Sequence, residues 1–316
     1  MPVPIIIDTD PGIDDALAIM LAVASPEVTV LGLTAVAGNT GLHHTAVNAA
    51  ALADLLNLNV PIGYGAAAPL WRRDTVPDGN VHGDNGFGGY ELPLSTRTLE
   101  PAIPLLVRLV ESSSEPVTLV AIGPLTNVAA FMALHPDTAR KLRRIVIMGG
   151  GTLDVLGNAT PAAEFNIYYD PDAAARVFDF GVPITMVGLN VTHRAILFPR
   201  DFAPLDQSGG PIAEMVARML GHYGEHAYAG QDGGAAQHDA LALAAVVQPD
   251  VITTRHLHVD VENVGRLTAG MTVVDFRNRP GREPNCDVAL DVDADRFRDL
   301  LIGRLVDLDA TLKNGL

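Results

Sequence analysis

Short, continuous apolar runs alternate along this chain with longer stretches rich in alanine and leucine. The runs include VPIII at 3–7, VTVLGLTAV at 28–36 and VTLVAIG at 117–123, and the longer stretches include HTAVNAAALADLL at 44–56 and TNVAAFMAL at 126–134. Apolar runs without polar alternation indicate strands that are buried on both faces, and helices between them join parallel strands. The pattern predicts an α/β fold with a central, mostly parallel sheet flanked by helices.

The same alternation continues without a linker, a repeat or a low-complexity tract, so we expect a single domain over residues 1–316 with a less regular C-terminal part. A hydrophobic content of 48% in 316 residues is ample for an extensive core. Two weakly patterned stretches, Arg72–Tyr90 and His222–Ala236, predict long loops, which in compact domains are commonly functional. The lone Trp71 is assigned to packing.

The net charge of the chain limits the kinds of molecule that it is expected to bind. A formal net charge of −16 and a pI near 4.8 argue against nucleic acid or an anionic membrane as the main partner, because both would repel the protein. Small neutral ligands and cations stay open as partners.

The cysteine content indicates the cellular compartment. One cysteine, Cys286, forms no internal disulfide and no thiolate cluster, which fits a reducing compartment. With no basic leader and no apolar stretch of about 18 residues, we expect a soluble, cytoplasmic protein.

Four aspartates stand close together in the segment DTDPGIDD at 8–15. Like charges at this density repel one another, so the segment favours a bound cation. Oxygen ligands without a Cys/His cluster favour Ca²⁺ or Mg²⁺ over zinc, and calcium tolerates irregular ligand geometry better. The segment is no EF-hand loop, because Gly12 falls one position early and Ile19 takes the place of the closing glutamate.

Other polar side chains follow later predicted strands. The carboxyl ends of parallel strands share one edge, where open α/β sheets bind ligands. The residues that reach this edge are Asp8, Asp10, Asp14 and Asp15 after the first strand, Asn39 after the second, Thr126 after VAIG, and Asn158, Glu164 and Asn166 after IVIMGGG. Taken alone, each has a simpler explanation: Asp14 and Asp239 fit helix caps, and Asn39 fits a turn.

Several motifs carry a family resemblance. They are DTDPGIDDALAI at 8–19, AVAGNT around Asn39, VHGDNGFGG at 81–89, GPLTNVA at 123–129, MGGG at 148–151, GNATPAAEFNIYYDPDAA at 157–174 and HDALA at 238–242. In this order they resemble the inosine-uridine preferring nucleoside hydrolases. The resemblance implies a mostly parallel α/β sheet, a homodimer or homotetramer, one Ca²⁺ in the cleft, and hydrolysis of the N-glycosidic bond of ribonucleosides to ribose and free base.

The resemblance also implies residue roles. The implied cation ligands are Asp10, Asp15, the backbone carbonyl of Thr126, and Asp239. The implied ribose contacts are Asp14, Asn39, Asn158, Glu164, Asn166 and Asp239. The implied catalytic residues are Asp10, which takes the proton of a calcium-oriented water, Asp14, and His238, which assists the leaving base. The residues expected near the nucleobase are His82, Tyr223, His226, Tyr228 and His238.

Two departures from the family pattern leave the base preference open. Asn85 stands where the family commonly has Asp, and Ala240 stands where it has Pro or Leu. Two rival functions are a nucleoside or ribose sensor without turnover, and a phosphatase of the haloacid dehalogenase type with Asp8 as nucleophile. The intact catalytic aspartates oppose the sensor, and Gly12 stands where the phosphatase motif needs Thr or Val.

Overall fold

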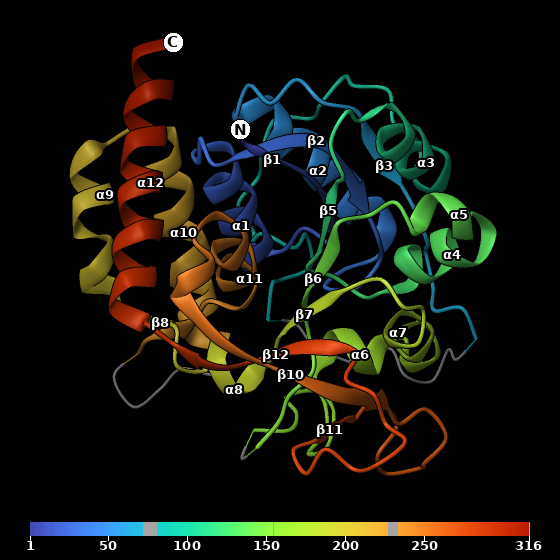
Figure 1. The fold of residues 1–316 in the computed structure, drawn as a ribbon. Coiled ribbons are helices and arrows are strands. Elements are labelled where there is room, and N and C mark those ends of the chain that lie inside the picture. The colour runs from blue at the N-terminus through green and yellow to red at the C-terminus, as the bar shows by residue number, and fades with distance from the viewer. Residues whose placement is uncertain (72–80, 154, 227–232, 316) are drawn as a thin grey trace.

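Over the residues that the structure describes, a ten-stranded sheet crosses the molecule in the order β11-β10-β12-β7-β6-β5-β1-β2-β3-β4, with helices on both faces (Figure 1). The computed structural model describes residues 1–71, 81–153, 155–226 and 233–315. The strands are β1 Val3–Thr9, β2 Val28–Ala35, β3 Ile62–Tyr64, β4 Glu100–Pro101, β5 Thr118–Ala121, β6 Arg144–Met148, β7 Ile184–Val187, β10 Ile252–Val261, β11 Thr272–Asp275 and β12 Cys286–Val292, and a separate pair is β8 Ile196–Leu197 and β9 Ala235–Ala236.

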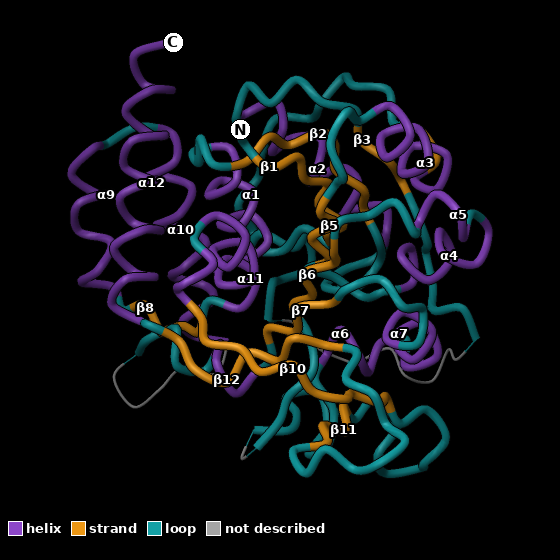
Figure 2. The backbone as a smooth tube through the Cα atoms, viewed as in Figure 1, coloured by secondary structure: helices purple, strands orange, loops and turns teal. Residues whose placement is uncertain are grey.

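The helices fall into two groups, one on each face of the sheet (Figures 1 and 2). On one face lie α1 Ile13–Val23, α2 Leu42–Leu55, α9 Ala203–Ser208, α10 Pro211–His226, α11 His238–Val247 and α12 Ala294–Gly315. On the other lie α3 Ala102–Ser112, α4 Thr126–Leu134, α5 Pro136–Ala139 and α7 Pro171–Phe178. The short helices α6 Phe165–Tyr169 and α8 Leu189–Thr192 follow β6 and β7, and single 3₁₀ turns span Pro199–Phe202 and Pro249–Val251.

Buried strands hold the two helical layers together. Ile5, Ile6 and Ile7 of β1 have no exposed surface, and they alternate between the cores on the two faces of the sheet. Burial of each such side chain stabilises the fold by roughly 1.5–3 kcal/mol. The central sheet is parallel from β4 to β12, and β10 pairs antiparallel with both of its neighbours, β12 and β11. The expected fold class is therefore confirmed.

The strand order reverses beside β1. From β1 the chain builds outwards through β2, β3 and β4 on one side, and through β5, β6 and β7 on the other. At such a switch point the loops after two neighbouring strands diverge and leave room for a ligand. The DTDPGIDD motif runs from the end of β1 into α1, and GPLTN runs from the loop after β5 into the start of α4, so both motifs meet at this position.

The C-terminal helix fixes the start of α10. Asp309 of α12 is fully buried, and its Oδ1 accepts the backbone N–H of Ile212 at 2.7 Å and of Ala213 at 3.2 Å. A carboxylate at this position satisfies N–H groups that a helix start otherwise leaves without partners. Helix α10 then runs to His226, so the loop expected from His222 begins later than the sequence suggested.

Two further expectations need correction. Asp8, expected after the first strand, lies inside β1, which extends to Thr9. The packing role expected for Trp71 is wrong, because 85% of its surface is exposed. Of the other predicted loop, residues 81–90 contain neither helix nor strand, as expected. Within the described ranges, no helix combines the length and the apolar character that a membrane crossing requires.

Candidate functional site

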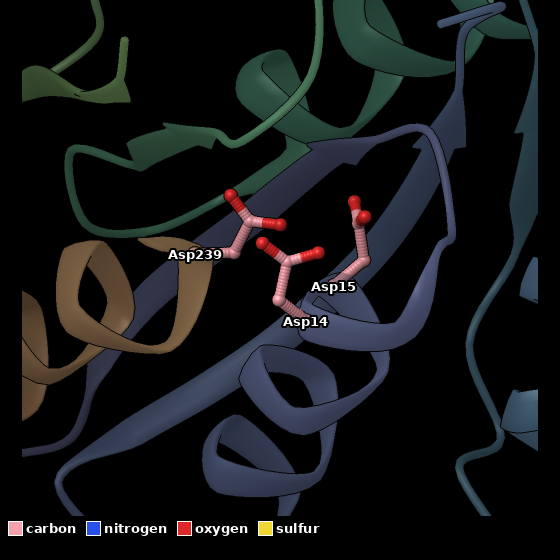
Figure 3. Close-up of side chains that lie close together, drawn as sticks. All are labelled: Asp14, Asp15 and Asp239. Carbon is pink, nitrogen blue, oxygen red and sulfur yellow. The ribbon is translucent and has the colours of Figure 1, made fainter. Parts of the chain in front are cut away.

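Three buried aspartates come together at the carboxyl edge of the sheet. Asp14 and Asp15 lie in the first turn of α1, and Asp239 lies in the first turn of α11. One carboxylate oxygen from each lies within 4.8 Å of the others, and the three residues are at most 5% exposed. Figure 3 shows the three carboxylates projecting into the same space from the two helices. Residues over 200 positions apart are thus joined because α1 packs on α11.

Asp10 lies next to this group in a close-fitting backbone cradle. Its Oδ2 accepts the backbone N–H of Asn39 at 2.7 Å, while its Oδ1 is buried without a hydrogen-bond partner among the described residues. A Cβ added at Gly38 would lie 2.0 Å from Oδ2, and one at Gly123 would lie 2.4 Å from Oδ1. The two glycines therefore leave just enough room for this carboxylate.

Hydrogen bonds fix the orientation of Asp15. Its Oδ1 accepts the hydroxyl of Thr9 at 2.5 Å, and its Oδ2 accepts the N–H of Gly12 and the side-chain amide of Asn39, both at 2.9 Å. The same amide also donates to the backbone oxygen of Asp10 at 3.1 Å. The amide hydrogens of Asn39, expected to contact ribose, are therefore used to hold two aspartates.

The electrostatics of this group favour a cation. Burial, and then the charge of Asp15, raise the pKa of Asp10 well above its usual range. The pKa of Asp239 is also raised well above its usual range, first by burial and then by the charges of Asp14, Asp15 and Asp10. Burial, and then the charge of Asp14, also raise the pKa of Asp15. A divalent cation among these carboxylates would reverse this effect and keep them ionised. Hard carboxylate oxygens such as those of Asp14, Asp15 and Asp239 fit Ca²⁺ or Mg²⁺.

Among the aspartates, the expected ligands and the observed cluster differ in one member. The resemblance implied Asp10, Asp15, Asp239 and the carbonyl of Thr126, whereas the oxygens that lie within 4.8 Å of one another belong to Asp14, Asp15 and Asp239. Thr126 begins α4 and is 1% exposed. Its hydroxyl donates to Oδ2 of Asp170 at 2.8 Å, and this contact holds the first turn of α4 in place.

Glu164 and Asn166 form another wall of the site. Glu164 caps α6, and its two carboxylate oxygens accept N–H groups from Gly150, Asn166 and Ile167 at 2.9–3.1 Å. Burial raises the pKa of Glu164 to about 7 despite these bonds. Asn166 donates its amide to the backbone oxygens of Ile122 and Met148 at 3.0 and 3.2 Å.

Asn158, the remaining expected ribose contact, lies further out. It is exposed, and its Oδ1 accepts the N–H of Phe165 at 2.9 Å, which helps to start α6. In this structure its side chain therefore organises the loop that carries Glu164.

Two histidines border the aspartates. His82 accepts the N–H of Ile13 on its Nδ1 at 3.1 Å, and Nδ1 lies 3.8 Å from Oδ1 of Asp14. Nδ1 of His238 lies 2.8 Å from the hydroxyl of Thr192. Burial lowers the pKa of His82 to about 4 and that of His238 to about 3, so both rings are neutral at pH 7 in this structure.

The nucleobase side is only partly visible. Tyr223 and His226 lie in the last turn of α10, where the backbone alone is described, and Tyr228 lies outside the described residues. Asn85, the departure in the VHGDNG motif, uses its amide within its own loop: Oδ1 accepts from Phe87 and Gly89 at 3.0 Å, and Nδ2 donates to Tyr90 at 2.9 Å. This residue therefore organises the loop after His82.

Sequence reasoning missed three residues that support the site. They are Asn127, Asp170 and Thr192. Asn127 donates to Oδ1 of Asp8 at 2.8 Å, and Thr34 donates to the same oxygen. Asn127 lies in the GPLTNVA motif, which could have drawn attention to it, whereas Thr192 stands in no motif.

Comparison with known proteins decides the family. Residues 5–299 match the family described as inosine-uridine preferring nucleoside hydrolase. The chain belongs to this family. As a nucleoside hydrolase, it places the family's motifs around the aspartate cluster at the switch point of its sheet.

Individual relatives support the same conclusion. The nucleoside hydrolase is 45% identical over 311 residues to the pyrimidine-specific ribonucleoside hydrolase RihA of Klebsiella pneumoniae (strain 342), covering 96% of this chain and 99% of that protein. It is 44% identical over 310 residues to RihA of Salmonella typhimurium, covering 96% and 99%. The solved purine-preferring ribonucleoside hydrolase from Gardnerella vaginalis superimposes with a TM-score of 0.88 at 31% identity, covering 98% and 99%.

Proposed function

We propose that this nucleoside hydrolase cleaves the N-glycosidic bond of pyrimidine ribonucleosides, such as uridine and cytidine, in a calcium-dependent reaction that yields ribose and the free base. The observation that carries the proposal is the buried group of Asp14, Asp15 and Asp239 at the switch point of the sheet, with Asp10 beside it. Family membership supplies the reaction class, and the carboxylates supply the site for the cation.

The residues proposed to hold the cation are Asp10, Asp15, Asp239 and the carbonyl of Thr126. When bound, calcium would lower the pKa of a water molecule and attract the hydroxyls of the sugar. The neighbouring Asp14 then accepts a hydrogen bond from a ribose hydroxyl. Asn39 keeps the two carboxylates in fixed positions, because its backbone N–H donates to Oδ2 of Asp10 and its side-chain amide donates to Oδ2 of Asp15. The same amide also donates to the backbone oxygen of Asp10.

Asp10 acts as the general base, and the structure suggests which of its atoms does so. Oδ2 is occupied by the N–H of Asn39, whereas Oδ1 has no hydrogen-bond partner in the described part of the chain. Oδ1 therefore accepts the proton of the attacking water. A positioned general base contributes about 10²- to 10⁴-fold to a rate. Attack by this water breaks the bond between the anomeric carbon and the base nitrogen.

The ribose is gripped by short polar side chains. Asn166 donates its amide hydrogens to backbone oxygens, so its Oδ1 can accept a hydrogen bond from a sugar hydroxyl. Glu164 lines the same wall with its carboxylate oxygens, and Asn158 contacts the sugar from the adjoining loop. As positive charge develops on the anomeric carbon, these oxygens stabilise the transition state more than the neutral substrate.

His238 delivers a proton or a hydrogen bond to the departing base, and His82 lies beside that base. Tyr223, His226 and Tyr228 stay predicted contacts of the base. The preference for pyrimidines rests on the RihA enzymes, which share 44–45% identity with this chain, against 31% for the purine-preferring structure.

A steady-state assay over uridine, cytidine, inosine and adenosine, with and without a calcium chelator, tests the proposal. We expect release of uracil and cytosine that exceeds release of hypoxanthine and that stops when the chelator removes the cation. Faster cleavage of inosine would overturn the pyrimidine preference, and cleavage of no nucleoside would overturn the proposed function. The expected homodimer or homotetramer and the expected cytoplasmic location stay predictions, of which light scattering measures the first.

A further inference from the structure

One buried hydroxyl is directed at His238. Thr192 ends α8, has no exposed surface, and places its Oγ1 2.8 Å from Nδ1 of the imidazole. Thr192 and His238 are 46 positions apart in the sequence, so this contact is made by the fold and not by a local turn. Among the described residues, the hydroxyl of Thr192 has no other hydrogen-bond partner.

The direction of this hydrogen bond follows from the bonding capacity of the two groups. A hydroxyl has one proton to donate, and a buried donor without an acceptor is costly. No backbone oxygen in the described part of the chain accepts the proton of Thr192, and Nδ1 of His238 is its one available acceptor. If Thr192 donates to Nδ1, a neutral imidazole must carry its own proton on Nε2.

The segment that carries Thr192 is firmly attached on both sides. Asn190 donates to the backbone oxygen of Ala289 in β12 at 2.9 Å, which ties α8 to the central sheet. After α8, the backbone oxygen of Ala195 accepts the N–H of Gln237 at 2.9 Å, and β8 pairs with β9. The chain on either side of the contact is therefore held in register, up to the residue before His238.

A second side chain from the same segment limits rotation of the ring. His193 packs edge-on against His238, with 5.7 Å between ring centroids and 62° between ring planes. Two consecutive residues at the end of α8 thus hold the imidazole, one through a hydrogen bond and the other through ring packing. A ring held in this way loses little freedom when the substrate reacts.

We propose that Thr192 is a positioning residue that donates its hydroxyl proton to Nδ1 of His238 and thereby keeps the transferable proton on Nε2. This inference rests on the proposed function, because it assigns Thr192 to the step in which the base departs. His238 could not serve this step in the opposite tautomer without first exchanging its proton. Thr192 itself does not touch the substrate and acts through His238 alone.

The test compares two leaving groups in four variants. Uridine needs a proton or hydrogen bond on its departing base, whereas p-nitrophenyl β-ribofuranoside releases a stable phenolate without one. Thr192→Val keeps the size of the side chain and removes the hydroxyl, and Thr192→Ser keeps the hydroxyl. Thr118→Val is the matched control, because Thr118 is also fully buried but its hydroxyl has no hydrogen-bond partner among the described residues. His238→Ala completes the set.

We expect Thr192→Val to lower kcat on uridine by at least about tenfold, while KM for uridine and kcat on the p-nitrophenyl riboside stay within about twofold of wild type. Thr192→Ser should restore most of the uridine rate, and Thr118→Val should change neither substrate. Activity on the p-nitrophenyl riboside also shows that each variant is folded.

A double-mutant cycle separates action through His238 from a general packing defect. If Thr192 acts through His238, the Thr192→Val change should add nothing to the loss that His238→Ala already causes on uridine. Three results would overturn the inference: an unchanged uridine rate in Thr192→Val, equal losses on both substrates, or independent losses in the double variant. A wild-type protein that cleaves the p-nitrophenyl riboside but no nucleoside would instead overturn the proposed function.

Discussion

The backbone N–H of Asn39 donates to Oδ2 of Asp10 at 2.7 Å, across a gap of 29 positions in the sequence. This bond joins the loop after β2 to the loop after β1 at the carboxyl edge of the sheet. It occupies one oxygen of Asp10 and leaves the other, Oδ1, without a partner in the described part of the chain. The first prediction rests on this difference between Oδ2, which accepts a hydrogen bond, and Oδ1, which accepts none from the described residues.

Asp10→Asn should lower kcat on uridine by at least about 100-fold and change KM little. The amide oxygen of the variant can still accept the N–H of Asn39, which places the NH₂ group where Oδ1 stood, and this group cannot take a proton from water. Initial-rate kinetics at saturating calcium measure the effect. Near-normal turnover in the variant would remove Asp10 from the role of general base.

The alternation of strands and helices made the fold predictable, because continuous apolar strands such as Ile5–Ile7 are stable only when helices cover both faces of a parallel sheet. The gathering of aspartates was predictable for the same reason, since loops after neighbouring parallel strands share one edge. Asp15 and Asp239 lie close together at this edge. Their proximity was predicted from the family motifs alone, because no local sequence pattern connects the two residues.

Contacts between distant segments could not be predicted. Thr126 and Asp170 form a hydrogen bond although they are 44 positions apart. Nothing in the sequence around either residue indicates that the two are in contact. Helix α10 extends past His222 into the predicted loop, because its packing outweighs the low helix propensity of Gly221 and Gly224. Trp71 is exposed because nothing in an isolated aromatic residue reveals whether the fold will cover it.

Gly38→Ala should reduce kcat/KM on uridine by about 100-fold or more, because displacement of a reacting group by about 1 Å can have this effect. The new Cβ would stand 2.0 Å from Oδ2 of Asp10, so the carboxylate must move. Gly41→Ala, three residues away in the same loop, is the control, since no atom lies within 4 Å of a Cβ there. Comparable activity in both variants would contradict the claim that Gly38 leaves the room that the carboxylate of Asp10 needs.

Asn39→Ala should weaken calcium binding by about 10- to 100-fold, as is typical when a group that orients metal ligands is lost. The amide of Asn39 holds Oδ2 of Asp15 at 2.9 Å and the backbone of Asp10 at 3.1 Å. Calorimetric titration of chelator-treated protein measures the affinity. Thr40→Val is the control, because the hydroxyl of Thr40 has no hydrogen-bond partner among the described residues. Equal calcium affinity in all three proteins would contradict this role.

His238→Ala should impair cleavage of uridine by at least about 100-fold and cleavage of p-nitrophenyl riboside far less, since only the base of uridine needs a proton to leave. His256→Ala should leave both rates unchanged, because His256 is an exposed residue whose Nδ1 pairs with Asp287 on the surface of the sheet. Both substrates are followed by absorbance. Losses of the same size on the two substrates would count against His238 as the donor to the base.

The central claim is that the aspartates hold a cation on which hydrolysis depends, and a joint titration tests it most directly. Protein freed of divalent cations by a chelator is titrated with Ca²⁺, while calorimetry follows occupancy and absorbance follows uracil release from uridine. We predict one strong site per chain, abolished in Asp239→Asn, and a rate that rises in proportion to its occupancy. Full uracil release by the cation-free protein would contradict the claim.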